Sequence, residues 1–154
     1  MAAHHSSAYR WFSRLLVGLT RQLLAARQAR AELLADNSPM VKVTHPAVSV
    51  RYQNRVVESL YLHTVALRNT GNRALKNQKV MIKLPGGGEI VQRELQTPRG
   101  ADFPTDLETS QLLSVTLDLL NPRERLVVTV TVIDSPTDAL EVIARGENLV
   151  FKEI

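Results

Sequence analysis

The chain has 154 residues, the usual length of one domain and long enough to bury an apolar core without metals or disulfides. Hydrophobic residues make up 44% and charged residues 22%, as in a folded globular protein. Cysteine is absent, which excludes disulfide scaffolds, thiolate metal sites and cysteine nucleophiles.

The formal net charge of +4 is unevenly distributed along the chain. Residues 1–36 carry 5 arginines and 2 acidic residues, so 5 minus 2 gives +3. The remaining 118 residues carry 14 basic and 13 acidic residues, which leaves only +1. Because the later part is nearly neutral, the sequence does not predict a nucleic-acid footprint spread over it.

The first 36 residues predict one long helix. From Ser7 to about Leu34 there is no proline and a single glycine, Gly18, and the run is rich in leucine, alanine, arginine and glutamine. These residues favour helix. The turn-forming run 36–39, which ends in Pro39, sets the expected end of the helix.

This helix is expected to be amphipathic, with an apolar seam and a basic face. Alternating spacings of four and three residues place the apolar side chains on one side. The seam, which we predict to be the partner-binding surface, consists of Trp11, Phe12, Leu15, Leu16, Leu19, Leu23, Ala26 and Leu33. The basic face consists of Arg10, Arg14, Arg21, Arg27 and Arg30.

Three interpretations of the helix stay open. Its seam packs against the rest of the protein, a partner or a second copy; or it lies on anionic lipid, as Arg-rich helices with Trp, Phe and Leu opposite do; or the segment is a mitochondrial targeting peptide. A membrane span is excluded because the uncharged stretch Leu15–Thr20 is closed by Arg14 and Arg21, far short of the ~20 apolar residues that a span needs.

After Pro39 the hydrophobic pattern changes to alternation, which predicts short strands. We expect strands over residues 40–44, 47–53, 59–69, 79–84, 89–95, 113–119, 126–132, 140–145 and 148–152. Turn-forming residues stand at 69–72 and 121–124, and the run 85–88 is expected to be a hairpin connection. Strands at this spacing without helices between them predict a mainly β protein, an antiparallel sandwich over residues 41–154 behind the helix of residues 1–36.

Three segments together resemble the CARDB-like branch of the immunoglobulin- and fibronectin-like sandwiches. They are Val65-Ala66-Leu67-Arg68-Asn69-Thr70-Gly71-Asn72, Val80-Met81-Ile82-Lys83-Leu84-Pro85 with the glycines that follow, and Leu120-Asn121-Pro122-Arg123-Glu124-Arg125-Leu126-Val127-Val128. The resemblance covers about residues 41–154. It implies a spacer or ligand-holding module without catalytic residues. The sequence departs from it at Arg123, where these modules often have glycine.

The residues that carry chemistry form no recognisable site in the sequence. None of the histidines, at positions 4, 5, 45 and 63, belongs to a metal-binding helix motif. The run Gly86-Gly87-Gly88 is not followed by the Gly-Lys-Ser/Thr of a phosphate-binding loop, and no nucleophile elbow occurs. We therefore predict no catalytic residues, no cofactor and no metal site.

The sequence-based expectation is a non-catalytic interaction or structural module. The helix would dock it to a protein assembly or to itself, while the sandwich presents loops or an edge strand to a partner protein. A peripheral membrane protein anchored by the helix is the alternative, and an accessory subunit associated with nucleic acid comes third. We expect a cytoplasmic location, either free or at the membrane surface.

Overall fold

The computed structural model describes residues 30–43, 49–98, 101, 103–146 and 149–154, with backbone only for 40–42. The chain divides into two units, Met1–Arg30 and Ala31–Ile154, and the strands that the structure describes belong to the second unit. Residues 7–29 of the helix expected from Ser7 to about Leu34 lie outside the described residues.

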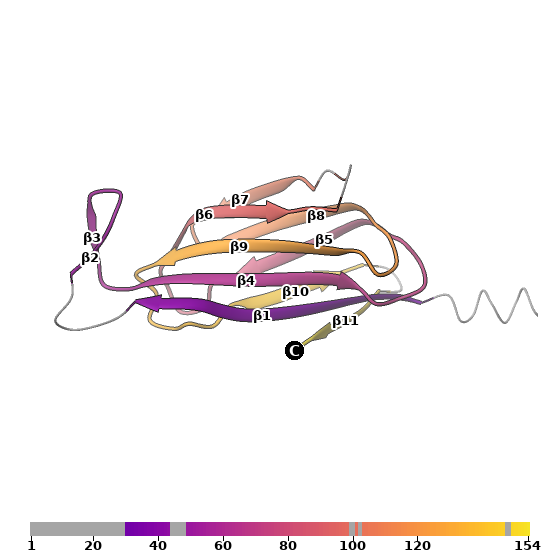
Figure 1. The fold of residues 1–154 in the computed structure, drawn as a ribbon, viewed down its shortest axis with the longest axis horizontal. Coiled ribbons are helices and arrows are strands. Elements are labelled where there is room, and N and C mark those ends of the chain that lie inside the picture. Colours follow the sequence, from indigo (N-terminus) through magenta and orange to yellow (C-terminus); the bar gives the residue numbers. More distant parts are fainter. Residues whose placement is uncertain (1–29, 44–48, 99–100, 102, 147–148) are drawn as a thin grey trace, which may run out of the picture. The chain divides into compact units, whose positions relative to one another are not determined.

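Two sheets and a separate hairpin make up the second unit (Figure 1). The larger sheet has the order β11-β1-β4-β9-β6 and contains β1 (Ala31–Val43), β4 (Leu60–Asn69), β6 (Glu89–Gln96), β9 (Arg125–Ile133) and β11 (Leu149–Glu153). The smaller sheet has the order β10-β5-β8-β7 and contains β5 (Leu75–Lys83), β7 (Thr105–Thr109), β8 (Leu112–Leu120) and β10 (Glu141–Arg145). The hairpin consists of β2 (Val50–Tyr52) and β3 (Arg55–Val57).

The core lies between the two sheets because alternate side chains of their central strands point inward. In β9 the buried positions are Leu126, Val128, Val130 and Val132, each 0% exposed, and the threonines between them are half-buried. Side chains of β1, β4, β5, β6, β8 and β10 belong to the same buried cluster. This two-layer arrangement of mainly antiparallel sheets is compatible with the predicted β-sandwich.

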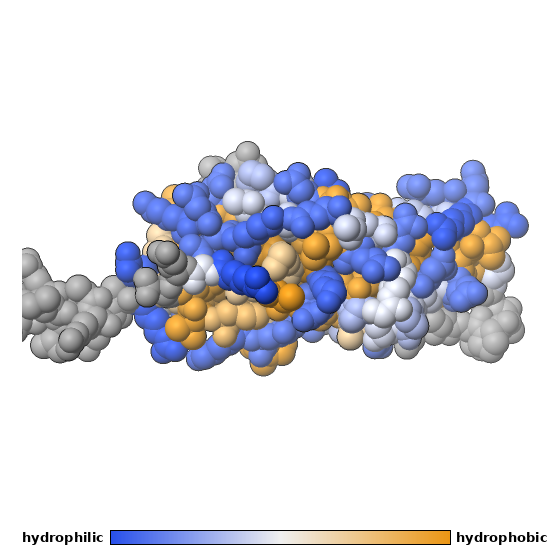
Figure 2. Space-filling model, turned by 180° about the vertical axis from the view of Figure 1, so that it is seen from behind, coloured by the Kyte–Doolittle hydropathy of each residue, from blue (hydrophilic) through white to orange (hydrophobic). Residues whose placement is uncertain are grey.

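The outer face of the smaller sheet is mixed in character. Figure 2, seen from behind, shows hydrophobic residues interspersed with hydrophilic ones on this side. Met81 and Ile143 are cross-strand neighbours there and are half-buried. The ion pair Lys83–Glu141, at 3.5 Å, flanks them.

The first strand corrects the expected end of the helix. β1 begins at Ala31, so residues 31–36 are strand, and the expected domain boundary at residues 36–41 lies inside it. Their sequence also alternates, and pairing with β4 and β11 buries Leu33 and Ala35 completely. Tertiary burial outweighs the local helix preference here. Pro39 stands where the pairing with β4 shifts register, a place where a strand tolerates proline.

The run Pro85-Gly86-Gly87-Gly88 is not the hairpin connection that the sequence predicts. It joins β5 of the smaller sheet to β6 of the larger sheet, so the chain crosses between layers. The turns after β4 and after β8 also cross between the sheets. Turn residues show where a strand ends, but the partner of the next strand depends on long-range packing.

Asn69 organises the turn between β4 and β5. Its side-chain Nδ2 donates to the carbonyl oxygens of Arg73 (2.8 Å) and Leu120 (2.9 Å), and its Oδ1 accepts from the Gly71 N–H (3.0 Å). Asn69 is 0% exposed. One side chain therefore joins this turn to the end of β8.

One strand pair departs from the antiparallel pattern. β1 and β11 pair in parallel, from Ala31 opposite Leu149 to Ala35 opposite Glu153. Because nearly the whole domain connects these two strands, no tight turn forces them to be antiparallel. Among the residues that the structure describes, no helix has the length and apolar character needed to cross a membrane.

Candidate functional site: the braced hairpin

The β2–β3 hairpin lies between β1 and β4 in the chain and belongs to neither large sheet. Its turn residues Gln53 and Asn54 both have positive φ, 45° and 68°. This is the conformation of the two-residue turns whose twist matches that of paired strands. The sequence predicts a single strand over 47–53 here and misses the hairpin, although Asn54 between two valine-containing runs was a signal for it.

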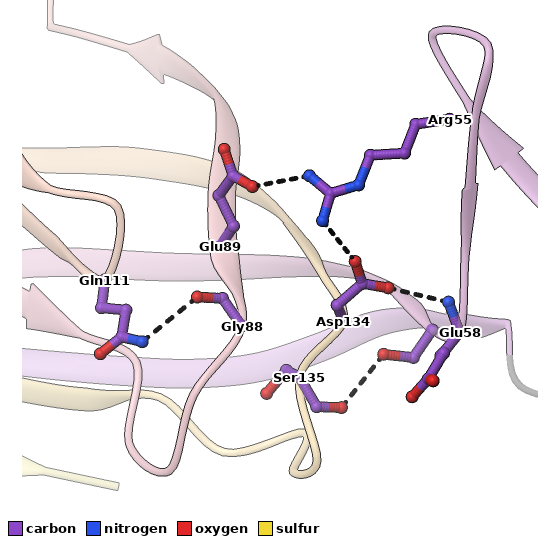
Figure 3. Close-up of polar contacts among 8 residues, drawn as sticks. Arg55, Glu58, Gly88, Glu89, Gln111, Asp134 and Ser135 are labelled. Carbon is purple, nitrogen blue, oxygen red and sulfur yellow. Dashed lines mark hydrogen bonds and ion pairs between the residues drawn. The ribbon is translucent and has the colours of Figure 1, made fainter.

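Arg55 braces the hairpin against the rest of the domain (Figure 3). Its Nη1 lies 3.0 Å from Glu89 Oε2 at the start of β6, and its Nη2 lies 2.9 Å from Asp134 Oδ2 after β9. The Arg55 side chain is 57% exposed, so each ion pair contributes only modestly to stability. Their joint effect is to orient the hairpin.

Asp134, which pairs with Arg55, also forms hydrogen bonds to the backbone of the segment between β3 and β4. Its second oxygen, Oδ1, accepts from the Glu58 N–H at 2.8 Å, and its own N–H donates to the Ser59 carbonyl at 3.0 Å. The buried Ser59 hydroxyl donates in turn to the Ser135 carbonyl at 3.0 Å. The segment between β3 and β4 is therefore hydrogen-bonded to the loop after β9 (Figure 3).

Gly88 allows the β5–β6 connection to pass close to this loop. Its φ is +92°, and a Cβ at this position would lie 2.8 Å from Ser135 Cα and 2.9 Å from the Ile133 carbonyl oxygen. Both neighbours are backbone atoms, which cannot move away cheaply. The glycine run thus serves close packing beside the hairpin.

The hairpin has one docked and one free face. Val57 is buried, and the Tyr52 hydroxyl lies 3.4 Å from Gln92 Oε1. On the other face Val56 pairs with Arg51, and both are exposed. Val56 is 59% exposed, so an apolar side chain stands on the outward face of the hairpin.

His63 is a polar group in the core, away from the hairpin face. It is 0% exposed in β4, its ring lies 5.9 Å from that of Tyr61, and neither ring nitrogen has a hydrogen-bond partner. Burial lowers the pKa of His63 below 6.5, against the opposing attraction of Asp138. The residues that the structure describes contain no group of three or more metal-ligating side chains.

The lowered pKa of His63 predicts that the protein loses stability on mild acidification. The unfolded chain takes up a proton near pH 6.5 while the folded one resists, so the free energy of unfolding falls as the pH drops below about 6.5 toward the folded pKa. When the free energy of unfolding is measured by chemical denaturation between pH 7.5 and about 5, that of His63→Leu should depend less on pH than that of the wild type. Parallel pH curves for the two proteins would contradict this assignment.

The structure places few of the predicted helix residues. The seam residues from Trp11 to Ala26 and the basic residues from Arg10 to Arg27 lie outside the described part of the chain. Arg30 is exposed just before β1. Leu33 is in β1 and fully buried, so its assignment to the helix seam is wrong. Sequence reasoning missed the brace because Arg55, Glu89 and Asp134 are far apart in the chain.

Comparisons with known proteins add little to this geometry. No family model matches the chain, and no curated protein matches it. Among solved structures, an M1 zinc metallopeptidase from Deinococcus radiodurans is similar with a TM-score of 0.34 and 16% identity. The match covers 70% of this chain and 20% of the peptidase chain. At this level the likeness supports no inference about fold or activity.

Proposed function

We propose that the protein is a non-catalytic interaction module whose β-domain presents the braced hairpin to a partner protein. The observation that carries the proposal is Val56, exposed on a hairpin whose other face is held by Arg55 and Asp134. Because the hairpin is already ordered, binding need not supply the free energy of ordering it. An apolar side chain beside Arg51 suits a protein surface with a small apolar pocket and an acidic neighbour.

We also propose that the fold is an immunoglobulin- or fibronectin-like sandwich of the CARDB-like kind. The order β1-β4-β9-β6 in the larger sheet corresponds to the A-B-E-D order of such sandwiches, and β10 lies beside β5 as strand F lies beside strand C. The β7–β8 pair and the parallel strand β11 are departures from that pattern.

In this proposal the N-terminal amphipathic helix docks the module to a protein assembly or to a second copy. The end of this helical segment is placed at Arg30 and not at residue 36, because β1 begins at Ala31. Anchoring of the helix to anionic lipid is the alternative, and a role beside nucleic acid is the third.

Replacing Val56 by glutamate is expected to abolish partner binding without unfolding the protein, since Val56 is largely exposed. The whole 154-residue chain would be used as bait in an extract of its own source cells. The matched control is Leu107→Glu, which alters an apolar side chain on β7 that is 39% exposed. Proteins captured by the wild type and the control should be lost from the Val56→Glu bait. Equal capture by all three baits would refute the role of the hairpin.

A further inference from the structure

Basic side chains gather at the end of the domain opposite the hairpin. This end is formed by the β4–β5 turn, the β8–β9 turn and the first residues of β1 and β11. We call its exposed cations the basic end: Arg68, Arg73, Lys76, Arg123 and Arg125. Within the described part of the chain none of them makes an ion pair. The nearby Glu124 carboxylate instead accepts from the Asn121 N–H at 2.7 Å.

Two of these cations face each other directly. Arg68 in β4 is the cross-strand partner of Arg125 in β9, and both are exposed. Like charges placed directly opposite in a sheet destabilise it. Leu34 and Lys152 continue the same row across β1 and β11, and Lys152 is paired with Glu32 at 2.8 Å, so the uncompensated charges of the row are those of the two arginines. A sheet under selection for stability alone would have an acidic residue in this row, so the repulsion indicates a ligand that relieves it.

Arg123 adds a second, independent source of destabilisation at the same end. Its φ is 72°, in the left-handed region that glycine occupies without strain and other residues avoid. Its N–H donates to the Asn69 carbonyl at 2.9 Å, which holds the turn in this conformation. Keeping arginine where glycine fits better indicates that the guanidinium itself is used.

A hollow of about 490 Å³ opens at this end between β1, β5 and β11. Apolar Ala31, Leu75 and Leu149 line it together with the cationic Arg73 and Lys76. The combination of apolar lining and cationic side chains suits an amphiphilic ligand whose head carries negative charge.

We propose that the basic end binds the surface of an anionic phospholipid bilayer. The first residue of the domain, Ala31, lies at this end, so the Arg-rich segment before it joins the domain where it would meet the membrane. The hairpin end carries Glu58, Glu89 and Asp134, of which Glu89 and Asp134 pair with Arg55, so it lacks the excess of unpaired cations found at the basic end. This charge difference would orient the domain with the hairpin pointing away from the bilayer. The inference goes beyond the proposed function, since it assigns a second surface to the β-domain itself.

Nucleic acid fits these observations less well than lipid. Single-stranded nucleic acid is held by aromatic side chains that stack on bases. Among the described aromatic residues, Tyr52 is on the hairpin, Tyr61 and Phe103 are buried, and Phe151 packs against the core. The cations also cluster at one end and do not form a stripe along a face.

The first test measures partition of the whole 154-residue chain onto phosphatidylcholine vesicles with and without phosphatidylserine. Each lost arginine should weaken binding to the anionic vesicles about fivefold at low salt. The double variant Arg68→Gln/Arg125→Gln should therefore bind these vesicles about 25-fold more weakly than the wild type. The charge-matched control away from the basic end, Arg93→Gln/Lys83→Gln, alters two exposed cations and should bind like the wild type. The difference in vesicle binding between the wild type and Arg68→Gln/Arg125→Gln should become smaller as salt is added.

Arg123→Gly sharpens the test because it should change stability and binding in opposite directions. Glycine relieves the positive φ and should raise the melting temperature, while vesicle binding falls about fivefold. A variant with higher stability and weaker binding cannot owe its loss to misfolding.

Two results would overturn the proposal. One is unchanged vesicle binding in both basic-end variants, even where the helix variant Phe12→Glu/Leu16→Glu releases the protein, since the helix alone would then be the anchor. The other is tighter, arginine-dependent binding to a single-stranded oligonucleotide than to the vesicles. The hairpin proposal is tested separately by Val56→Glu, so either proposal can fail while the other stands.

Discussion

Replacing Leu33 by alanine is expected to lower the free energy of unfolding by about 2–5 kcal/mol. Leu33 is 0% exposed in β1 and belongs to the cluster between the two sheets, so the substitution leaves a cavity. Denaturant unfolding measures the loss. The neighbouring Leu34, which is half-buried on the opposite face of the strand, is the matched control, and its alanine variant should lose less than half as much.

Truncation gives an independent check of the same strand. A chain that begins at Ala31 keeps β1 intact and should fold, whereas one that begins after Asp36 lacks Leu33, Ala35 and the partner of β11. The shorter chain should be strongly destabilised or fail to fold. If it were as stable as the longer one, residues 31–36 would belong to the helical segment and not to the sheet.

Asn69→Ala is expected to lower the free energy of unfolding by about 3 kcal/mol, because it leaves the buried carbonyl of Leu120, the partly buried carbonyl of Arg73 and the Gly71 N–H without their partner. Asn69→Asp should cost more, since a carboxylate keeps the shape and can accept from Gly71 but places negative charge against two carbonyl oxygens. Thermal or denaturant unfolding of both variants measures these effects.

The exposed neighbour Thr70 provides the control for Asn69. Its alanine variant should stay within about 0.5 kcal/mol of the wild type, as surface substitutions usually do. If Asn69→Asp were as stable as the wild type, the two donated hydrogen bonds would not hold the turn, and the link between β4 and β8 would rest on apolar packing alone.

The proposals for the two ends of the domain rest on different kinds of observation. At the hairpin end the polar contacts are satisfied, and the informative feature is an apolar side chain left exposed. At the basic end the informative features are unfavourable ones, namely the Arg68–Arg125 pair and the positive φ of Arg123. Natural sequences tolerate such local costs where a function requires them.

Local sequence patterns were sufficient to predict the elements that depend only on residues close together in the chain. The alternation in residues 126–132 predicted β9, the run 59–69 predicted β4, and the turn residues at 69–72 and 121–124 stand where these strands end or begin. Alternation with a period of two predicts a strand with one buried face wherever its partners lie, so the mainly β class follows from it.

The amino-acid sequence by itself therefore determined the class of the fold, the strands that alternate cleanly and the places where the chain turns, because these depend on contacts between near neighbours. Only the tertiary structure decided that residues 31–36 are strand, that Pro85-Gly86-Gly87-Gly88 crosses between sheets, and that Arg55 reaches Glu89 and Asp134. The segment at Leu33 satisfies both a helical and an alternating pattern. The apolar surface that β4 and β11 offer from distant parts of the chain selects between them.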